Sequence, residues 1–176
     1  MQDHYWEICL LQDSPENTTY SRLRLVLSGI LLLLIMIVQW NFIYYDFADD
    51  LPNTALTALC LIVSYAVYTY AVLLVRALTP RFVQTLTSLF CTHIIIRLFL
   101  SPLLLLSPYL AQNHIKNPVY LFFGILYLVL NLSLLVWQFV ITAHIYKYAL
   151  NTTDIQSVLA AFGLFAVNVL TVSLMR

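Results

Sequence analysis

Five long runs of apolar residues, separated by short polar segments, make up most of this 176-residue chain. A helix needs about 20 residues, each rising about 1.5 Å, to cross the hydrocarbon core of a bilayer, and each run is about that long or longer. The pattern therefore predicts an all-α, polytopic membrane helix bundle with about five transmembrane helices. The predicted spans cover residues 25–45, 56–75, 82–101, 119–148 and 155–175.

The third apolar run is too long for one straight span, since it stays apolar from residue 82 to about residue 110. Pro102 and Pro108, each preceded by a serine, interrupt it. Proline lacks a backbone N–H group, and its ring clashes with the preceding helical turn. We therefore expect the third helix to end near Ser101 and residues 102–110 to form a short interfacial or re-entrant segment.

The first 24 residues, called the leader below, are too polar to form a span. They contain one short apolar cluster, from Tyr5 to Leu11, which lies among acidic residues and ends before Pro15. Such a segment is typical of a helix in the headgroup plane, and a disordered tail is the alternative. The span that follows is too long for a signal peptide and lacks a small-x-small cleavage site. The chain thus divides into the leader (1–24) and a five-helix transmembrane domain (25–176).

The composition is typical of a protein that is embedded in a lipid bilayer. Hydrophobic residues make up 62% of the chain and charged residues only 9%, whereas soluble domains are nearer half apolar and a quarter charged. Basic and acidic residues balance at eight each, so no binding to nucleic acid is predicted. The three cysteines lie far apart without a CxxC motif, which predicts neither a zinc site nor a disulfide framework. No cofactor is expected.

The positive charges predict the orientation in the membrane. On one side of the membrane, Arg22 and Arg24 precede the first span, Arg76 and Arg81 lie between the second and the third, and Lys147 lies at the end of the fourth. The opposite side carries only Lys116 and Arg176, together with an acidic loop formed by Asp46, Asp49 and Asp50. Because cytoplasmic loops are enriched in Lys and Arg, we expect a cytoplasmic N-terminus and an external C-terminus. The compactness of the chain suggests the inner (plasma) membrane of a bacterium.

Seven polar side chains inside the predicted spans are the candidates for contact with a ligand or partner, because a polar group in lipid is costly. Counting about 1.5 Å per residue places them in two adjacent layers, about 15 and about 20 Å from the cytoplasmic edge. The first layer contains Tyr65, His93 and Gln138. The second contains Gln39, Arg97 and Asn168, with Asn131 slightly deeper.

No Asp or Glu falls within any predicted span. Proton-coupled transporters, intramembrane aspartyl proteases and carboxylate-bound metal sites need such a group at depth, so the sequence disfavours these classes. It also contains no motif for a nucleophilic serine and no zinc-binding HExxH. We therefore predict no catalytic residue, no metal site and no enzymatic activity.

The polar layers admit two interpretations. The amides and hydroxyls either form interhelical hydrogen bonds that set the register of the bundle, or line a polar cavity for a ligand or a lipid headgroup. Arg97 also has two options. If the helix ends at Ser101, the long side chain can carry the guanidinium to the outer face. Otherwise it binds carbonyls freed by Pro102, or an anion such as a lipid phosphate or the carboxylate of a partner protein.

Aromatic residues near the span ends are expected to anchor the bundle at the membrane interfaces. These interfacial candidates are Trp6, Trp40, Trp137, His144 and Tyr148, together with Tyr44 and Tyr45. His93 and His144 also invite a haem interpretation, with one axial ligand from each of two helices. Their depths differ by about 10 Å, which disfavours that interpretation, and aromatic packing is expected rather than quinone contacts.

Two segments carry a family resemblance. Residues 137–165 (WQFVITAHIYKYALNTTDIQSVLAAFGLF) combine a fourth helix that includes a tryptophan, a polar turn and a fifth helix with small residues. Residues 10–27 (LLQDSPENTTYSRLRLVL) supply a polar leader. In these segments and in topology the chain resembles the Yip-type five-span membrane family, including its small bacterial members. The resemblance implies a non-enzymatic membrane factor and transfers no catalytic residue.

Three functional hypotheses remain. The first is an accessory or assembly subunit that associates laterally with other integral membrane proteins, through its lipid-facing helices, its leader and the acidic loop at 46–50. The second is a small transporter, channel or lipid-handling protein that uses the polar layer around Arg97. The third is a redox subunit that binds haem or quinone.

Overall fold

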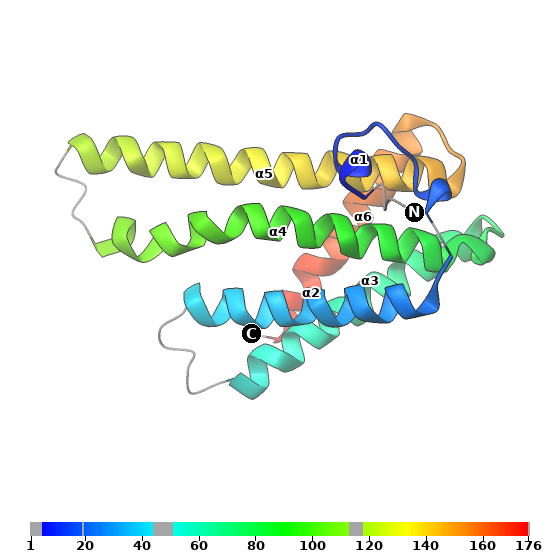
Figure 1. Cartoon of the computed structure of the whole chain (residues 1–176), viewed down its shortest axis with the longest axis horizontal. Coiled ribbons are helices and arrows are strands. Elements are labelled where there is room, and N and C mark those ends of the chain that lie inside the picture. The colour runs from blue at the N-terminus through cyan, green and yellow to red at the C-terminus, as the bar shows by residue number, and fades with distance from the viewer. Residues whose placement is uncertain (1–4, 19, 44–50, 113–117, 176) are drawn as a thin grey trace.

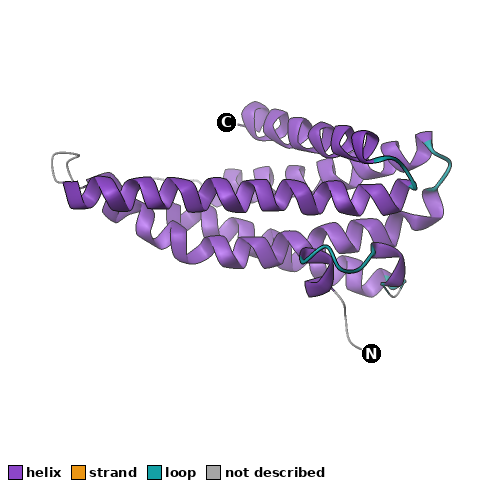
Figure 2. Cartoon of the chain, turned by 90° about the horizontal axis from the view of Figure 1, so that it is seen from above, coloured by secondary structure: helices purple, strands orange, loops and turns teal. Residues whose placement is uncertain are grey.

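A computed structural model describes residues 5–18, 20–43, 51–112 and 118–175. Within these residues the chain is helical, with short connecting loops and no strand (Figure 2). The leader contains α1 (Tyr5–Cys9) and the 3₁₀ turn η1 (Pro15–Asn17). The long helices are α2 (Arg22–Ile43), α3 (Leu51–Val75), α4 (Phe82–Gln112), α5 (Pro118–Leu150) and α6 (Asp154–Met175), and η3 (Thr79–Arg81) precedes α4.

The prediction of a five-helix, all-α bundle is confirmed. The five long helices are each long and apolar enough to cross a membrane, which indicates an integral, multi-pass membrane protein. α3 begins at Leu51, earlier than the predicted residue 56, and the other predicted starts fall within three residues of the observed ones. Several features singled out in the sequence lie outside the described residues: Tyr44, Tyr45, the acidic loop at 46–50, Lys116 and Arg176.

The predicted break in the third span is wrong. α4 runs as one helix of 31 residues through both Pro102 and Pro108, so residues 102–110 form no separate interfacial or re-entrant segment. Membrane helices tolerate proline where neighbouring groups satisfy the disturbed backbone. The carbonyl that Pro102 deprives of its helical N–H donor is that of Leu98. The neighbouring carbonyl of Arg97 accepts hydrogen bonds from Ser101 Oγ at 2.9 Å and from Gln39 Nε2 at 2.7 Å, so α2 is bonded to α4 close to the proline.

The five long helices pack in a closed order. α2 packs against α3 and α4, α5 packs against α4 and α6, and α3 closes the bundle against α6. Buried residues from all five helices form the core, among them Met36, Leu73, Leu89, Ile145 and Leu164. At about 1.5 Å per residue, α4 and α5 are about 45 to 50 Å long, well above the thickness of a bilayer core of about 30 Å. Their hairpin accordingly extends beyond the other helices at one end of the bundle (Figure 1).

α5 is buried unevenly. Its last turns, from Ile141 to Leu150, lie mostly in the core, whereas every residue from Leu121 to Val136 is exposed or half-buried. α6 starts next to the buried end of α5 and runs obliquely away from it (Figure 1). The two helices therefore diverge toward the exposed half of α5, and this divergence shapes the cavity described below.

The leader packs against α4 and α5. Ile8 and Cys9 of α1 are completely buried. The polypeptide leaves α1 through Leu11, which adopts a left-handed backbone conformation with φ of 61°. Only this part of the apolar cluster, Ile8 and Cys9, is covered by the helices of its own chain, since Trp6, Leu10 and Leu11 are exposed.

Candidate functional site

A cavity lies between α5 and the helices α3, α4 and α6. It has a volume of about 560 Å³ and is called the interhelical cavity below. Five of the seven predicted polar candidates line it: Tyr65, His93, Asn131, Gln138 and Asn168. These side chains come from four helices, so only the tertiary arrangement brings them together.

Most of the wall of the interhelical cavity is apolar. α5 contributes leucines such as Leu128 and Leu132, and α6 contributes Leu164 and Phe165. Leu128 is 62% exposed and Phe165 is 47% exposed, so both line the cavity and also reach the outer surface of the bundle. The cavity therefore opens sideways, between the diverging helices α5 and α6, toward the region that lipid occupies.

His93 is a deeply buried polar residue in the cavity wall. Its side chain is only 3% exposed, and neither ring nitrogen has a hydrogen-bond partner among the described residues. The edge of the Tyr65 ring packs against it, with ring centroids 5.1 Å apart. A buried polar group without a partner costs about 1–3 kcal/mol, so the site favours an occupant that can hydrogen-bond to the imidazole.

A second cavity of about 490 Å³, called the arginine cavity below, adjoins the first. It shares Tyr65, Gln138, Phe165 and Asn168 with the interhelical cavity and adds Arg97. The two cavities are thus continuous through these shared residues. Trp40, predicted as an interfacial anchor, lines the arginine cavity.

Gln39, the remaining polar candidate, joins α2 to α4. Its Oε1 accepts a hydrogen bond from Arg97 Nη1 at 2.9 Å, and its Nε2 donates to the Arg97 carbonyl at 2.7 Å and to Ser101 Oγ at 3.0 Å. The third helix was expected to end at Ser101, the condition for extension of Arg97 to the outer face, but α4 continues for 15 residues past Arg97. The guanidinium is held at the arginine cavity.

The two interpretations of the polar layers therefore apply to different residues. Asn168 Oδ1 accepts an interhelical hydrogen bond from Ser64 Oγ at 3.2 Å. Asn131, in contrast, donates to the Tyr127 carbonyl of its own helix at 2.8 Å, which leaves its side-chain oxygen free to face the cavity. Gln39, Arg97 and Asn168 connect helices, whereas His93, Asn131 and Gln138 face the interhelical cavity.

The predicted interfacial residues of α5 bind the leader. Trp137 Nε1 donates to the Cys9 carbonyl at 3.0 Å, and His144 Nε2 lies 3.0 Å from the Asp13 carbonyl. The rings of His144 and Tyr148 pack together at 4.8 Å. Trp6 of the leader packs on Phe99 of α4, with ring centroids 6.0 Å apart. The leader thus follows α5 over about 10 Å, from residue 144 to residue 137, at about 1.5 Å per residue.

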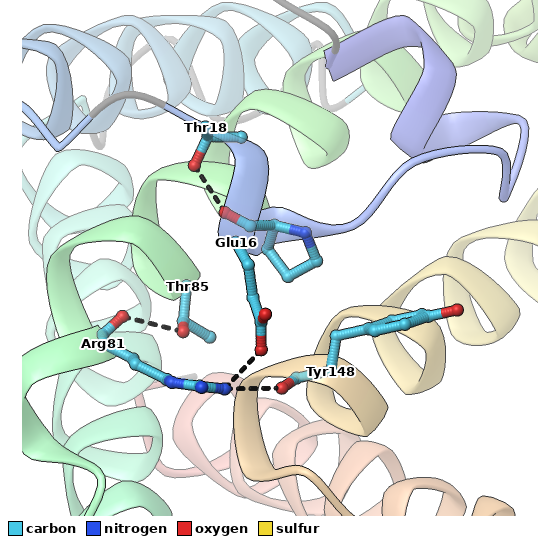
Figure 3. Close-up of polar contacts among 6 residues, drawn as sticks. Glu16, Thr18, Arg81, Thr85 and Tyr148 are labelled. Atoms are coloured by element: carbon cyan, nitrogen blue, oxygen red, sulfur yellow. Dashed lines mark hydrogen bonds and ion pairs between the residues drawn. The ribbon is translucent and has the colours of Figure 1, made fainter.

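An ion pair fastens the leader at the end of the bundle (Figure 3). The Arg81 guanidinium, at the start of α4, binds the Glu16 carboxylate and donates to the Tyr148 carbonyl at 3.1 Å. Thr18 closes η1 by donating to the Pro15 carbonyl at 2.7 Å, and its own carbonyl accepts from Gln84 Nε2 at 3.0 Å. The ring of Tyr148 points away from this cluster, so only its backbone takes part.

The structure does not support the haem interpretation, since His93 and His144 do not face one site. His144 binds the leader backbone, whereas His93 lines the interhelical cavity. In the part of the chain that the structure describes, no three His, Cys, Asp or Glu side chains gather where they could hold a metal ion.

Several residues of the site were missed in the sequence. Thr142 lines the interhelical cavity, and Ser64 and Ser101 position Asn168 and Gln39. Thr142 lies four residues from the predicted Gln138, so helical spacing could have found it. The serines carry no such signal, because an isolated hydroxyl in a membrane helix usually bonds to its own backbone.

Comparison with protein-family models, with curated proteins and with solved structures finds no match to this chain. The resemblance to the Yip-type family stays a prediction, and the function has to be argued from the geometry.

Proposed function

We propose that this protein is a non-enzymatic, integral membrane protein that binds a lipid-like, amphiphilic molecule in the interhelical cavity. The observation that carries the proposal is the buried imidazole of His93, which has no hydrogen-bond partner among the described residues and lines a cavity that opens toward lipid. A ligand with a polar head and an apolar chain matches the polar interior and the apolar opening. This is the lipid-handling form of the second sequence-based hypothesis.

The shape of the site supports a ligand that enters from the membrane. Pockets for small molecules are mostly apolar, with a few polar groups that orient the ligand, and those of several hundred Å³ bury most of a ligand of that size. The exposed leucines of α5 provide the apolar entrance, and His93, Asn131 and Gln138 provide the polar groups. No Asp, Glu, Ser, Cys or Lys among the described residues lines the cavity, so binding rather than catalysis is proposed.

The proposed location is the inner membrane of a bacterium, with the N-terminus in the cytoplasm. The distribution of charge supports this orientation, since Arg22, Arg76, Arg81 and Lys147 lie at or next to helix ends on one side of the bundle (Figure 1). The Glu16–Arg81 and Lys147–Asp154 ion pairs lie at the same end. Under the positive-inside rule, this end faces the cytoplasm.

Gly124→Phe tests the proposal, because Gly124 lines the interhelical cavity and has open space around it: an added Cβ meets no atom within 4 Å. The expected result is a loss of lipid binding by about tenfold, equivalent to about 1.4 kcal/mol. The measurement is native mass spectrometry of the purified, delipidated protein, titrated with defined phospholipids.

Ile125→Phe is the matched control. It adds the same side chain at the next position of α5, which is 56% exposed and lies outside the cavity wall. The proposal expects this variant to bind lipid as the wild type does. Equal binding by both variants and the wild type would contradict it, as would a wild-type protein that retains no lipid above the non-specific level.

A second candidate function is the accessory subunit that associates laterally with another membrane protein. The observation that favours it is the surface of α5, where only 6% of the spanning window is buried inside the bundle, the lowest share among the five helices. A photo-crosslinking residue at Phe122 of α5 should capture one protein at a stoichiometric level if this face binds a partner. Leu174 of α6, which is 81% exposed, is the control position. The same partner captured from both positions would indicate random contact.

A further inference from the structure

We infer that the ligand of this protein carries an anionic headgroup, and that Arg97, positioned by Gln39, recognises it. The inference rests on the proposed function and deepens it, since it assigns the chemical class of the ligand. The shared chemistry is a single negative charge on an acyl chain, which a phospholipid phosphate or a fatty-acid carboxylate can supply.

Arg97 lies at the middle of α4, with 15 residues of the helix on each side. At about 1.5 Å per residue it is about 22 Å from either helix end, farther than an arginine side chain can reach. The guanidinium therefore reaches neither end of α4. It stays at the arginine cavity, beside Trp40 and Ser173, which lie near the ends of α2 and α6. A charge in that position is costly unless a partner compensates it.

The described residues provide no carboxylate for this charge. They include four acidic residues, namely Glu7, Asp13, Glu16 and Asp154. The first three belong to the leader, and Asp154 begins α6, where it pairs with Lys147 at 2.5 Å. Within these residues the guanidinium instead has a neutral hydrogen-bond partner, Gln39 Oε1. The arginine cavity thus holds a cation without an anion from the described part of the chain.

Neutral donors surround the same space. A guanidinium has five N–H groups, and the bond to Gln39 uses one of them. The phenol of Tyr65, the amides of Gln138 and Asn168 and the hydroxyl of Ser173 also line the arginine cavity. A carboxylate or phosphate accepts hydrogen bonds from such groups, and bonds to a charged acceptor are about twice as strong as those between neutral groups.

The apolar wall fits the rest of the ligand. Leu61, Val169 and Val172 line the arginine cavity, and Phe165 is shared with the interhelical cavity. An acyl chain attached to a headgroup at Arg97 can therefore extend past Phe165 toward the opening between α5 and α6. The charged and apolar ends of the ligand each have a matching surface.

The test measures the preference of the delipidated protein for anionic over uncharged or zwitterionic amphiphiles in a neutral detergent. The probes are phosphatidylglycerol, oleate, phosphatidylcholine and monoolein, each titrated and followed by native mass spectrometry. We expect at least one anionic probe to bind about tenfold or more tightly than its neutral counterpart, the change that a charge-assisted hydrogen bond supports. Preference for phosphatidylglycerol over phosphatidylcholine identifies a phospholipid with a net negative charge, and preference for oleate over monoolein identifies a carboxylate.

Two arginine variants make the assignment specific. Arg97→Gln should abolish the preference while neutral amphiphiles still bind. Arg76→Gln removes a cation from the exposed end of the bundle, where Arg76 bonds to Gln156, and should leave the preference unchanged. Because Arg97→Gln can also weaken the fold, Gln39→Leu provides a second variant. It keeps the charge of Arg97 but removes the hydrogen bond that orients the guanidinium, so it should reduce the preference only in part.

The two proposals fail in different ways. If the wild type binds anionic and neutral amphiphiles equally, the inference about Arg97 is wrong and the proposed function stands. If the wild type binds none of the four probes, the proposed function is wrong as well. A preference for anions that survives Arg97→Gln would also overturn the inference.

Discussion

The side-chain amide of Gln39 on α2 holds both the backbone and the side chain of Arg97 on α4. Its nitrogen donates to the Arg97 carbonyl at 2.7 Å, and its oxygen accepts from the Arg97 guanidinium at 2.9 Å. One residue thus sets the register of two neighbouring helices and the direction of the charge at the arginine cavity. The packing of α2 against α4 and the proposed recognition of the anion therefore depend on the same three groups, namely the Gln39 amide and the carbonyl and guanidinium of Arg97.

Gln39→Leu should destabilise the protein by about 1–3 kcal/mol, because it leaves the Arg97 guanidinium and a backbone carbonyl with fewer partners. The measurement is the midpoint of thermal unfolding in detergent. Asn41→Leu is the control, since Asn41 Nδ2 donates only to the Ile37 carbonyl of its own helix at 2.8 Å. If both variants lose the same stability, the interhelical bond of Gln39 contributes nothing of its own.

Gly163→Ala should be strongly destabilising, by about 1–3 kcal/mol as expected of overpacking. A Cβ at Gly163 would lie 2.0 Å from the hydroxyl oxygen of Tyr68, which donates to the Ala160 carbonyl at 2.8 Å. Tyr68 would have to move, and the contact between α3 and α6 would open. The unfolding midpoint and the concentration dependence of chemical denaturation report this change.

Gly124→Ala is the matched control for Gly163→Ala, because a Cβ at Gly124 meets no atom within 4 Å. It should be neutral or stabilise the helix by up to about 1 kcal/mol, as replacement of a helical glycine by alanine does. Tyr68→Phe combined with Gly163→Ala removes the closest contact and should recover part of the loss. Equal effects of the two glycine variants would show that close packing at Tyr68 is unimportant.

Trp137→Phe should loosen the leader, since it removes the hydrogen bond from the indole to the Cys9 carbonyl while keeping an aromatic ring. Loss of about 0.5–1.5 kcal/mol corresponds to roughly a two- to tenfold increase in opening. With Cys60 and Cys91 replaced by serine, maleimide labelling of Cys9 measures the opening rate. Trp40→Phe, which lies on α2 at the arginine cavity, should leave the labelling rate unchanged.

Labelling of Cys9 should increase over a higher pH range than labelling of an ordinary cysteine. Burial, with a smaller effect from Cys91, raises the pKa of the Cys9 thiol to about 12. The thiolate is the reactive form, so labelling of the docked leader should keep increasing between about pH 9 and pH 12, where an ordinary cysteine has levelled off.

The same raised pKa has a consequence for stability. The unfolded chain ionises Cys9 at its ordinary pKa, so the neutral thiol stabilises docking below about pH 9, and this contribution is lost as the pH rises toward 12. Labelling that levels off near pH 9 in the wild type would show that Cys9 is not buried in solution.

The five apolar runs were sufficient to predict the helices, because hydropathy over about 20 residues is a local property and the bilayer imposes a minimum length. The polar candidates could also be chosen from the sequence, since polar side chains in lipid are rare and costly. Local periodicity could not show where they converge. His93 and Asn131 lie on different helices, and only the packing of α4 against α5 places both at one cavity.

One error has a physical cause that lies outside the local sequence. Pro102 was expected to end the third span, but α4 continues through it as one helix, with α2, α3 and α5 packed against it. The contacts of the leader could not be predicted from the sequence either, because Trp137 and His144 of α5 bind its backbone carbonyls from far along the chain.

The sequence alone determined that this protein is a bundle of five long apolar helices with a single arginine, and no acid, inside the predicted spans. These properties follow from the solubility of each segment in hydrocarbon, which depends on its own residues. Only the tertiary structure decided that Arg97 faces a cavity, that the cavity opens between α5 and α6, and that the leader packs against α4 and α5. Those features depend on which helices contact one another. In lipid, helices associate through packing and hydrogen bonds rather than through the hydrophobic effect.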